Sequence, residues 1–104
     1  MSYLDKLYGK TVIDSSDSDE LAKDYKMELE YYQIEKETNS KPYGIKIVKK
    51  NVENYAINIE EKVIENICDN MQDLGNLLEI LISSKVTPIS VDDVLDDLKK
   101  TQVI

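Results

Sequence analysis

Apolar side chains recur at every second position in three segments in the middle of the chain, residues 24–34, 43–50 and 54–60. A period of two is typical of a β-strand with one buried face. The links between the segments are short, which favours an antiparallel meander over a crossover connection. The alternating apolar positions are Tyr25, Met27, Leu29 and Tyr31, then Tyr43, Ile45 and Ile47, then Tyr55, Ile57 and Ile59. Residues 63–67 are expected to extend the third strand or to form a brief fourth one.

Tyr31 and Tyr32 are consecutive, so they cannot both face the same side of a strand. Tyr32 and Ile34 follow the phase opposite to Tyr31, which indicates either a β-bulge or a strand that is partly covered on both faces. At least one of the two rings therefore lies off the main core. Tyrosine is favoured at protein interfaces, so Tyr31 and Tyr32 are candidate partner-binding residues. The alternative is that both rings simply cover a thin core.

The period becomes helical after residue 69, where Asp69 and Gln72 resemble a capping box. Pro88 then separates this helix from a second one, which Ser90 is expected to cap. The apolar stripes are Met71, Leu74, Leu77, Leu78 and Leu81 in the first helix and Val91, Val94, Leu95 and Leu98 in the second. The chain is therefore predicted to be an α+β fold, an antiparallel three- to four-stranded meander sheet followed by two C-terminal helices packed on one face.

The outer side of the last helix is acidic and carries Asp96 and Asp97. Three interpretations fit these carboxylates: the solvated side of a structural lid, a docking surface for a partner, or a metal site. Helix capping and solvation explain most acidic positions in this segment. Asp96 and Asp97 are kept as candidate partner-binding residues, and no metal site is predicted.

The N-terminal region reads as two pieces. Residues 1–13 place Tyr3, Leu4, Leu7 and Tyr8 about one turn apart, which predicts a short amphipathic helix. Residues 14–20 are acidic and lack apolar groups, which is typical of a mobile linker. They do not fit a calcium loop, because the central glycine is missing. We therefore divide the chain into an N-terminal extension, residues 1–22, and a single α+β domain, residues 23–104.

The charge balance argues against several partners. The formal net charge is −8, and every cation is a lysine. Nucleic-acid binding needs a basic patch, and arginine is the usual residue for bidentate phosphate recognition. Lys46, Lys49 and Lys50 near Tyr43 are the local argument for such binding, but lysines that protect a strand edge explain the same residues. The chain also lacks an apolar run long enough for a membrane span or a signal peptide, so a cytoplasmic protein is expected.

The residues also argue against catalysis. The chain contains no histidine, and its one cysteine, Cys68, has no histidine to activate it. Gly9, Gly44 and Gly75 form no phosphate-binding motif, and Gly44 instead predicts a bulge or a close backbone approach within the sheet. We expect neither enzymatic activity nor a cofactor.

Two stretches, KPYGIKIVKK and LEILISSKVTPISVDDVLDDL, resemble a family of small clostridial proteins known only as a domain of unknown function. The resemblance covers roughly residues 25–98, and its most specific part is the connector Lys85, Val86, Thr87, Pro88 and Ile89. The first 22 residues do not share it. It implies a clostridial source and a cytoplasmic location, and it implies no activity.

A protein-binding role is the function class that these exclusions leave. We expect a small acidic regulatory or adaptor module that binds another protein. The alternatives are a self-associating domain, including a homodimer, or a small-molecule-binding domain without catalytic activity.

Overall fold

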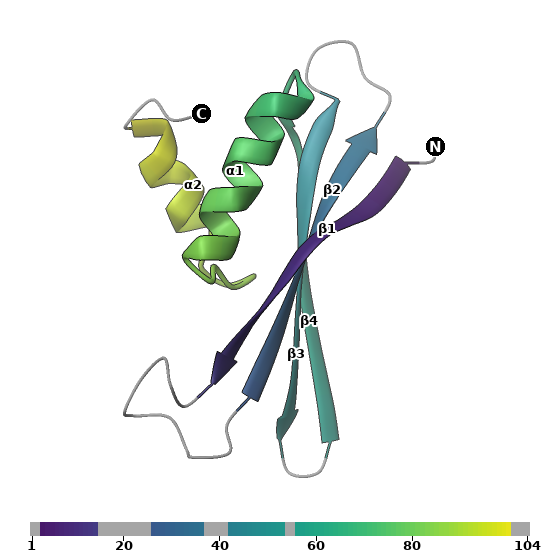
Figure 1. Cartoon of the computed structure of the whole chain (residues 1–104), viewed down its shortest axis with the longest axis vertical. Coiled ribbons are helices and arrows are strands. Elements are labelled where there is room, and N and C mark those ends of the chain that lie inside the picture. The colour runs from purple at the N-terminus through teal and green to yellow at the C-terminus, as the bar shows by residue number, and fades with distance from the viewer. Residues whose placement is uncertain (1–2, 15–25, 37–41, 54–55, 101–104) are drawn as a thin grey trace.

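The computed structural model describes residues 3–14, 26–36, 42–53 and 56–100. Within these residues the strands are β1 (Tyr3–Asp14), β2 (Lys26–Lys36), β3 (Tyr43–Glu53) and β4 (Ala56–Cys68), and the helices are α1 (Met71–Ser83) and α2 (Val91–Lys100). The strands form one antiparallel sheet in the order β1-β2-β3-β4. Both helices lie on the same side of the sheet (Figure 1). The predicted α+β fold, a meander followed by two C-terminal helices, is confirmed.

The helix predicted over residues 1–13 is wrong, because the described part of this segment, from Tyr3 onward, lies in β1. It pairs with β2 from Tyr3 opposite Lys36 to Asp14 opposite Lys26. A helix this short has little stability of its own, whereas an edge position in the sheet supplies a full row of backbone partners. The β-branched run at residues 11–13 also favours a strand. The predicted linker from residue 15 onward, and the boundary at residue 22, lie outside the described residues.

A β-bulge in β1 turns two residues toward the helices. The register with β2 shifts between Leu7 and Gly9, which leaves Tyr8 as the extra residue. The Tyr8 hydroxyl donates to Oε1 of Glu79 in α1 at 2.9 Å. A Cβ atom on Gly9 would lie 2.9 Å from Cδ1 of Ile82 in the same helix. The bulge therefore fastens β1 to α1.

The second bulge explains Gly44. Between Tyr43 and Ile45 of β3, the partner residue on β4 moves from Cys68 to Ile64, so β4 carries extra residues there. Asn66, within this bulge, has a φ of 58°. A Cβ atom on Gly44 would collide with the Ile64 carbonyl oxygen and lie 2.9 Å from Cα of Glu65. The close approach predicted at Gly44 is confirmed, and β4 runs on through the bulge as one strand.

The core lies between the sheet and the helices. It includes Leu29, Tyr31, Ile45, Ile47, Leu74, Leu77, Leu78, Leu81, Val86, Val91 and Leu95. The predicted stripes of both helices thus contribute to the core, with Val94 and Leu98 partly buried, but Met71 at the start of α1 is 44% exposed. Helix α1 begins after Asn70, whose side chain accepts a 2.8 Å bond from the Asp73 amide, so the cap lies one residue beyond Asp69. The helices cover only the upper part of the strands, and the lower part of the sheet extends beyond them (Figure 1).

Candidate functional site

The face of the sheet opposite the helices, which we call the open face, is covered by no helix among the described residues (Figure 1). Its residues follow from the strand alternation: Tyr31 and Ile47 are buried in the core, so Tyr32 and Lys46 point the other way. The strand register sets them in rows across the sheet. One row is Leu7, Tyr32, Lys46 and Val63, and another is Val12, Glu28, Lys50 and Ile59.

Exposed apolar side chains lie on this face near both edges of the sheet. Leu7 on β1 is 44% exposed, and Ile59 and Ile57 on β4 are 61% and 73% exposed. Sequence periodicity had placed Ile57 and Ile59 on the apolar side of a strand. They are exposed because Ile59 pairs with Lys50 and shares its outward direction, so no helix covers this side. Locating them requires the register that sets Ile59 opposite Lys50, which the sequence pattern alone does not supply.

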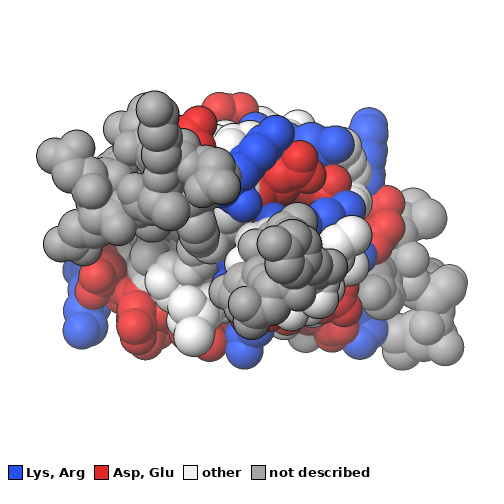
Figure 2. Space-filling model, turned by 90° about the horizontal axis from the view of Figure 1, so that it is seen from below, with Lys and Arg blue, Asp and Glu red and all other residues white. Residues whose placement is uncertain are grey.

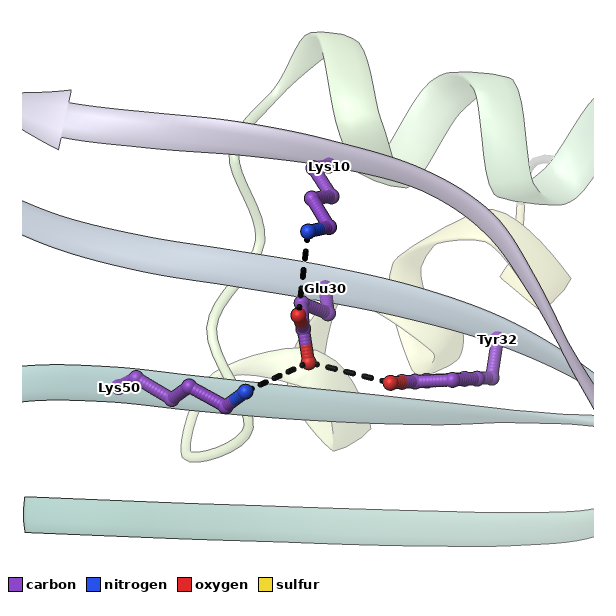
Figure 3. A network of polar contacts seen from close by, with 4 residues as sticks. All are labelled: Lys10, Glu30, Tyr32 and Lys50. Carbon is purple, nitrogen blue, oxygen red and sulfur yellow. Dashed lines mark hydrogen bonds and ion pairs between the residues drawn. The ribbon is translucent and has the colours of Figure 1, made fainter.

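A polar network occupies the centre of the open face (Figure 3). Glu30 of β2 is buried, and its carboxylate lies 3.6 Å from Nζ of Lys10 on β1 and 3.3 Å from Nζ of Lys50 on β3. The Tyr32 hydroxyl donates to the same carboxylate at 3.1 Å. One carboxylate thus links three neighbouring strands.

The network keeps Glu30 ionised. Burial opposes its ionisation, but hydrogen bonds from Lys50 and Tyr32 and the charges of Lys50 and Lys10 outweigh burial, so the pKa of Glu30 lies below its usual value. Burial, followed by the hydrogen bond to Glu30, raises the pKa of Tyr32. The Tyr32 hydroxyl therefore stays a hydrogen-bond donor at neutral pH.

Lysine charges on this face are matched by carboxylates. Nζ of Lys46 lies 4.7 Å from the centroid of the Tyr32 ring and 2.6 Å from Oδ2 of Asp5. Nζ of Lys36 lies 2.8 Å from Oε2 of Glu65. On the side of the molecule seen from below, the basic and acidic side chains of the described residues are likewise intermixed (Figure 2). Among the residues that the structure describes, the open face is a mosaic of apolar groups and paired charges and carries no basic patch.

Tyr31 and Tyr32 have different environments. Tyr31 is fully buried, and its hydroxyl donates to the Val86 carbonyl oxygen at 2.8 Å, which joins β2 to the segment between the helices. Burial raises the pKa of the Tyr31 hydroxyl. Tyr32 is partly exposed on the open face. The register of β2 with β3 is unbroken, so this strand has no bulge toward β3 and is partly covered on both faces. Only Tyr32 of the pair can contact a partner.

Asp96 and Asp97 are exposed on α2, on the side away from Val91 and Leu95. They lie on the helix side of the sheet, so the structure does not bring them together with Tyr32. Among the described residues, no group of three or more His, Cys, Asp or Glu side chains could hold a metal ion.

The connector between the helices contains hydrogen bonds between its own polar groups. The Ser90 hydroxyl accepts from the Thr87 amide at 3.2 Å and lies 2.9 Å from the Thr87 hydroxyl. The side chain expected to cap α2 thus bonds back to the connector. Ile89 projects from this turn and is 84% exposed.

A comparison with family models matches residues 10–101 to a family described as "Family of unknown function (DUF6514)". The match begins at residue 10 and not near residue 25, so it takes in part of β1. Searches of curated proteins and of solved structures found no match. No helix among the described residues is long and apolar enough to cross a membrane. Because the family match spans most of its length, the chain belongs to this family of unknown function, DUF6514.

Proposed function

We propose that the protein is a non-catalytic, cytoplasmic protein-binding module of the regulatory or adaptor type, from a clostridial source, and that its partner docks on the open face. One observation carries this proposal: the open face exposes Leu7, Tyr32 and Ile59 around a rigid polar centre. Exposed apolar and tyrosine side chains on an ordered surface are typical of protein-binding sites. Strand pairing fixes their spacing before a partner arrives, which lowers the entropy cost of binding.

The charge pattern of the open face supports a protein partner over a nucleic acid. Lys10 and Lys50 share the carboxylate of Glu30, and Lys46 pairs with Asp5. A phosphate backbone would have to displace these carboxylates or lie beside them. A protein surface with apolar side chains and both signs of charge fits the mosaic without breaking the existing pairs.

The Lys46–Tyr32 pair is expected to be the centre of the contact. The lysine charge lies over the ring, which favours one ring orientation, and the Tyr32 side chain is partly exposed. Leu7 lies next to Tyr32 in the same row, so a partner that covers the ring also covers Leu7. Substituting Leu7 therefore probes the contact without disturbing the Glu30 network.

The test is capture of partner proteins from the source cytoplasm by immobilised wild-type protein and by Leu7→Lys. We expect a defined protein to be retained by the wild type and lost with Leu7→Lys, because the lysine places a charge at the apolar contact. Ile89→Lys is the matched control, since Ile89 is also an exposed apolar residue but lies on the connector. Equal capture by the wild type and Leu7→Lys would refute docking on the open face. Retention of a small molecule in place of a protein would support the small-molecule alternative.

A further inference from the structure

We propose that the exposed end of β4 pairs with the same segment of a second copy, in an antiparallel arrangement with a twofold axis at Asn58. This goes beyond the proposed docking on the open face, because it uses the edge of the sheet and names a second copy of the chain as the partner. The contact consists of residues 56–60 of each copy.

This part of β4 is an edge without the usual protection. In the strand order, β4 has β3 on one side and no strand on the other among the described residues. Edge strands commonly carry lysine, proline, bulges or covering elements that block pairing with another chain. The bulge at Asn66 and the charged run at residues 60–62 protect the upper part of β4. Residues 56–59 carry neither charge nor proline, and this end of the strand extends beyond the helices (Figure 1).

The side chains here also favour a covered state. Ile57 and Ile59 are 73% and 61% exposed and lie on the same face of β4. Both are β-branched, and such residues are stabilised by packing against neighbours across a strand pair. In the single chain, Ile59 has the long cation Lys50 opposite it on β3. The outer side of β4 is where an apolar neighbour can be added.

Charge and apolar contact together favour one register, since a register centred on Ile57 gives a single Ile57–Ile57 pair within residues 56–60. In an antiparallel pair of identical strands, the residue numbers of facing positions have a constant sum. Registers centred on Glu60, Glu61 or Lys62 place like charges directly opposite each other, which is destabilising. A register centred on Ile59 puts Ile57 opposite Glu61. Only the register centred on Asn58 sets Ile57 opposite the second copy's Ile59, twice, and places Glu60 opposite Ala56.

This pairing would join the two sheets into one. A twofold axis perpendicular to the sheet puts both open faces on one side and both helix pairs on the other. Each copy then extends away from the axis with its helix-covered part outermost. A pairing of five residues per copy buries less surface than a stable interface, which buries roughly 1,200–2,000 Å² in total. The dimer is therefore expected to be reversible and to depend on concentration.

The test is sedimentation equilibrium of the purified full chain across a wide concentration range. We expect the wild type to shift from monomer to dimer. Ile57→Lys should raise the dissociation constant of the dimer by about tenfold, because two equivalent cross-strand contacts are lost together. The double variant Ile57→Lys/Ile59→Glu should restore association, since the selected register sets each introduced lysine opposite an introduced glutamate. Ile57→Lys/Ile59→Lys should remain monomeric, and the control Ile89→Lys should associate as the wild type does.

The proposal is overturned if the wild type stays monomeric at the highest concentration. It is also overturned if the wild type forms a dimer but Ile57→Lys/Ile59→Glu does not restore the association that Ile57→Lys weakens. Amide hydrogen exchange of the wild type gives a measurement that needs no variant. Protection of residues 56–60 should rise with protein concentration, and unchanged protection also overturns the proposal. A monomer that still captures a protein through Leu7 would refute self-association alone and leave docking on the open face intact.

Discussion

Gly44 lies where the bulge of β4 passes closest to β3, and its missing side chain leaves room for the backbone at Ile64 and Glu65. In Gly44→Ala the added methyl group would meet backbone atoms, which cannot turn aside as a side chain can. We expect the free energy of unfolding to fall by about 1–3 kcal/mol, the range of overpacked sites. Urea denaturation followed by circular dichroism measures this change.

Gly75 is the matched control for Gly44. It lies inside α1, and a Cβ atom there would come no closer than 3.6 Å to the Tyr8 hydroxyl. Gly75→Ala should therefore raise the free energy of unfolding by about 0.5–1 kcal/mol, because alanine is the better helix former. Equal losses for both substitutions would contradict a special role for the β4 bulge.

Glu30→Gln tests the centre of the open face. The pKa of Glu30 is lower in the folded chain than its ordinary value of 4.5, so the ionised group stabilises the fold above that pH. This contribution is lost as the pH falls through the folded pKa. At pH 7 the variant should lose about 1.5–3 kcal/mol of unfolding free energy, the value of hydrogen bonds to a charged group.

Thermal melts of the wild type and Glu30→Gln from pH 7 to pH 3 measure this dependence. Because a protonated glutamate resembles glutamine, the difference between the two melting temperatures should shrink as the pH falls below about 4.5 and should disappear below the folded pKa of Glu30. A constant difference across this range would show that the charge of Glu30 does not stabilise the fold.

Among the elements, the sequence predicted those whose period is unbroken. Strand β3 alternates through Tyr43, Ile45 and Ile47, β2 alternates up to Tyr31, and α1 and α2 carry regular apolar stripes. Strand β1 was missed because the spacing of Tyr3, Leu4, Leu7 and Tyr8 also fits a helix, and because the bulge at Tyr8 breaks its alternation. The open face was missed for a related reason. Apolar alternation shows that a strand has two unlike sides, but only pairing with its neighbours shows which side the helices cover.

Helix α2 offers a test of an element that the sequence predicted well. Leu95 is buried in the core, whereas Asp96 is exposed. Leu95→Ala should reduce the free energy of unfolding by about 2–5 kcal/mol, as is usual for truncating a buried leucine. Asp96→Asn should change it by less than about 0.5 kcal/mol. Urea titration of both variants measures the two values, and a large effect of Asp96→Asn would assign that carboxylate a structural role in α2.

At the scale of the whole molecule, the strands are longer than the helices that cover them. The chain measures 47 × 33 × 18 Å, and the lower part of the sheet has no helix on either side (Figure 1). Sequence periodicity gives the length of each element but not how far one layer extends past another. Because the strands extend beyond the helices, the candidate binding surfaces lie on the sheet. The sequence pattern had instead indicated the acidic side of the last helix.

The place of β1 in this sheet leads to the last prediction. Deleting residues 1–14 removes the strand that covers one edge of β2, together with the Tyr8–Glu79 hydrogen bond and the packing of Gly9 on Ile82. Leu29 and Tyr31 would then belong to a new edge strand. If residues 1–14 were only an extension of the domain, their deletion should leave the fold intact. With β1 as a member of the sheet, its loss should remove much of the roughly 5–15 kcal/mol that stabilises a domain of this size.

Differential scanning calorimetry of the truncated chain distinguishes these outcomes. We expect the cooperative transition to be lost, or its midpoint to fall sharply, with aggregation through the exposed edge of β2. Leu7→Lys in the full chain is the control, because it changes an exposed side chain and leaves the β1 backbone paired. That variant should melt close to the wild type. A truncated chain that keeps the wild-type transition would show that β2, β3, β4 and the helices fold without β1.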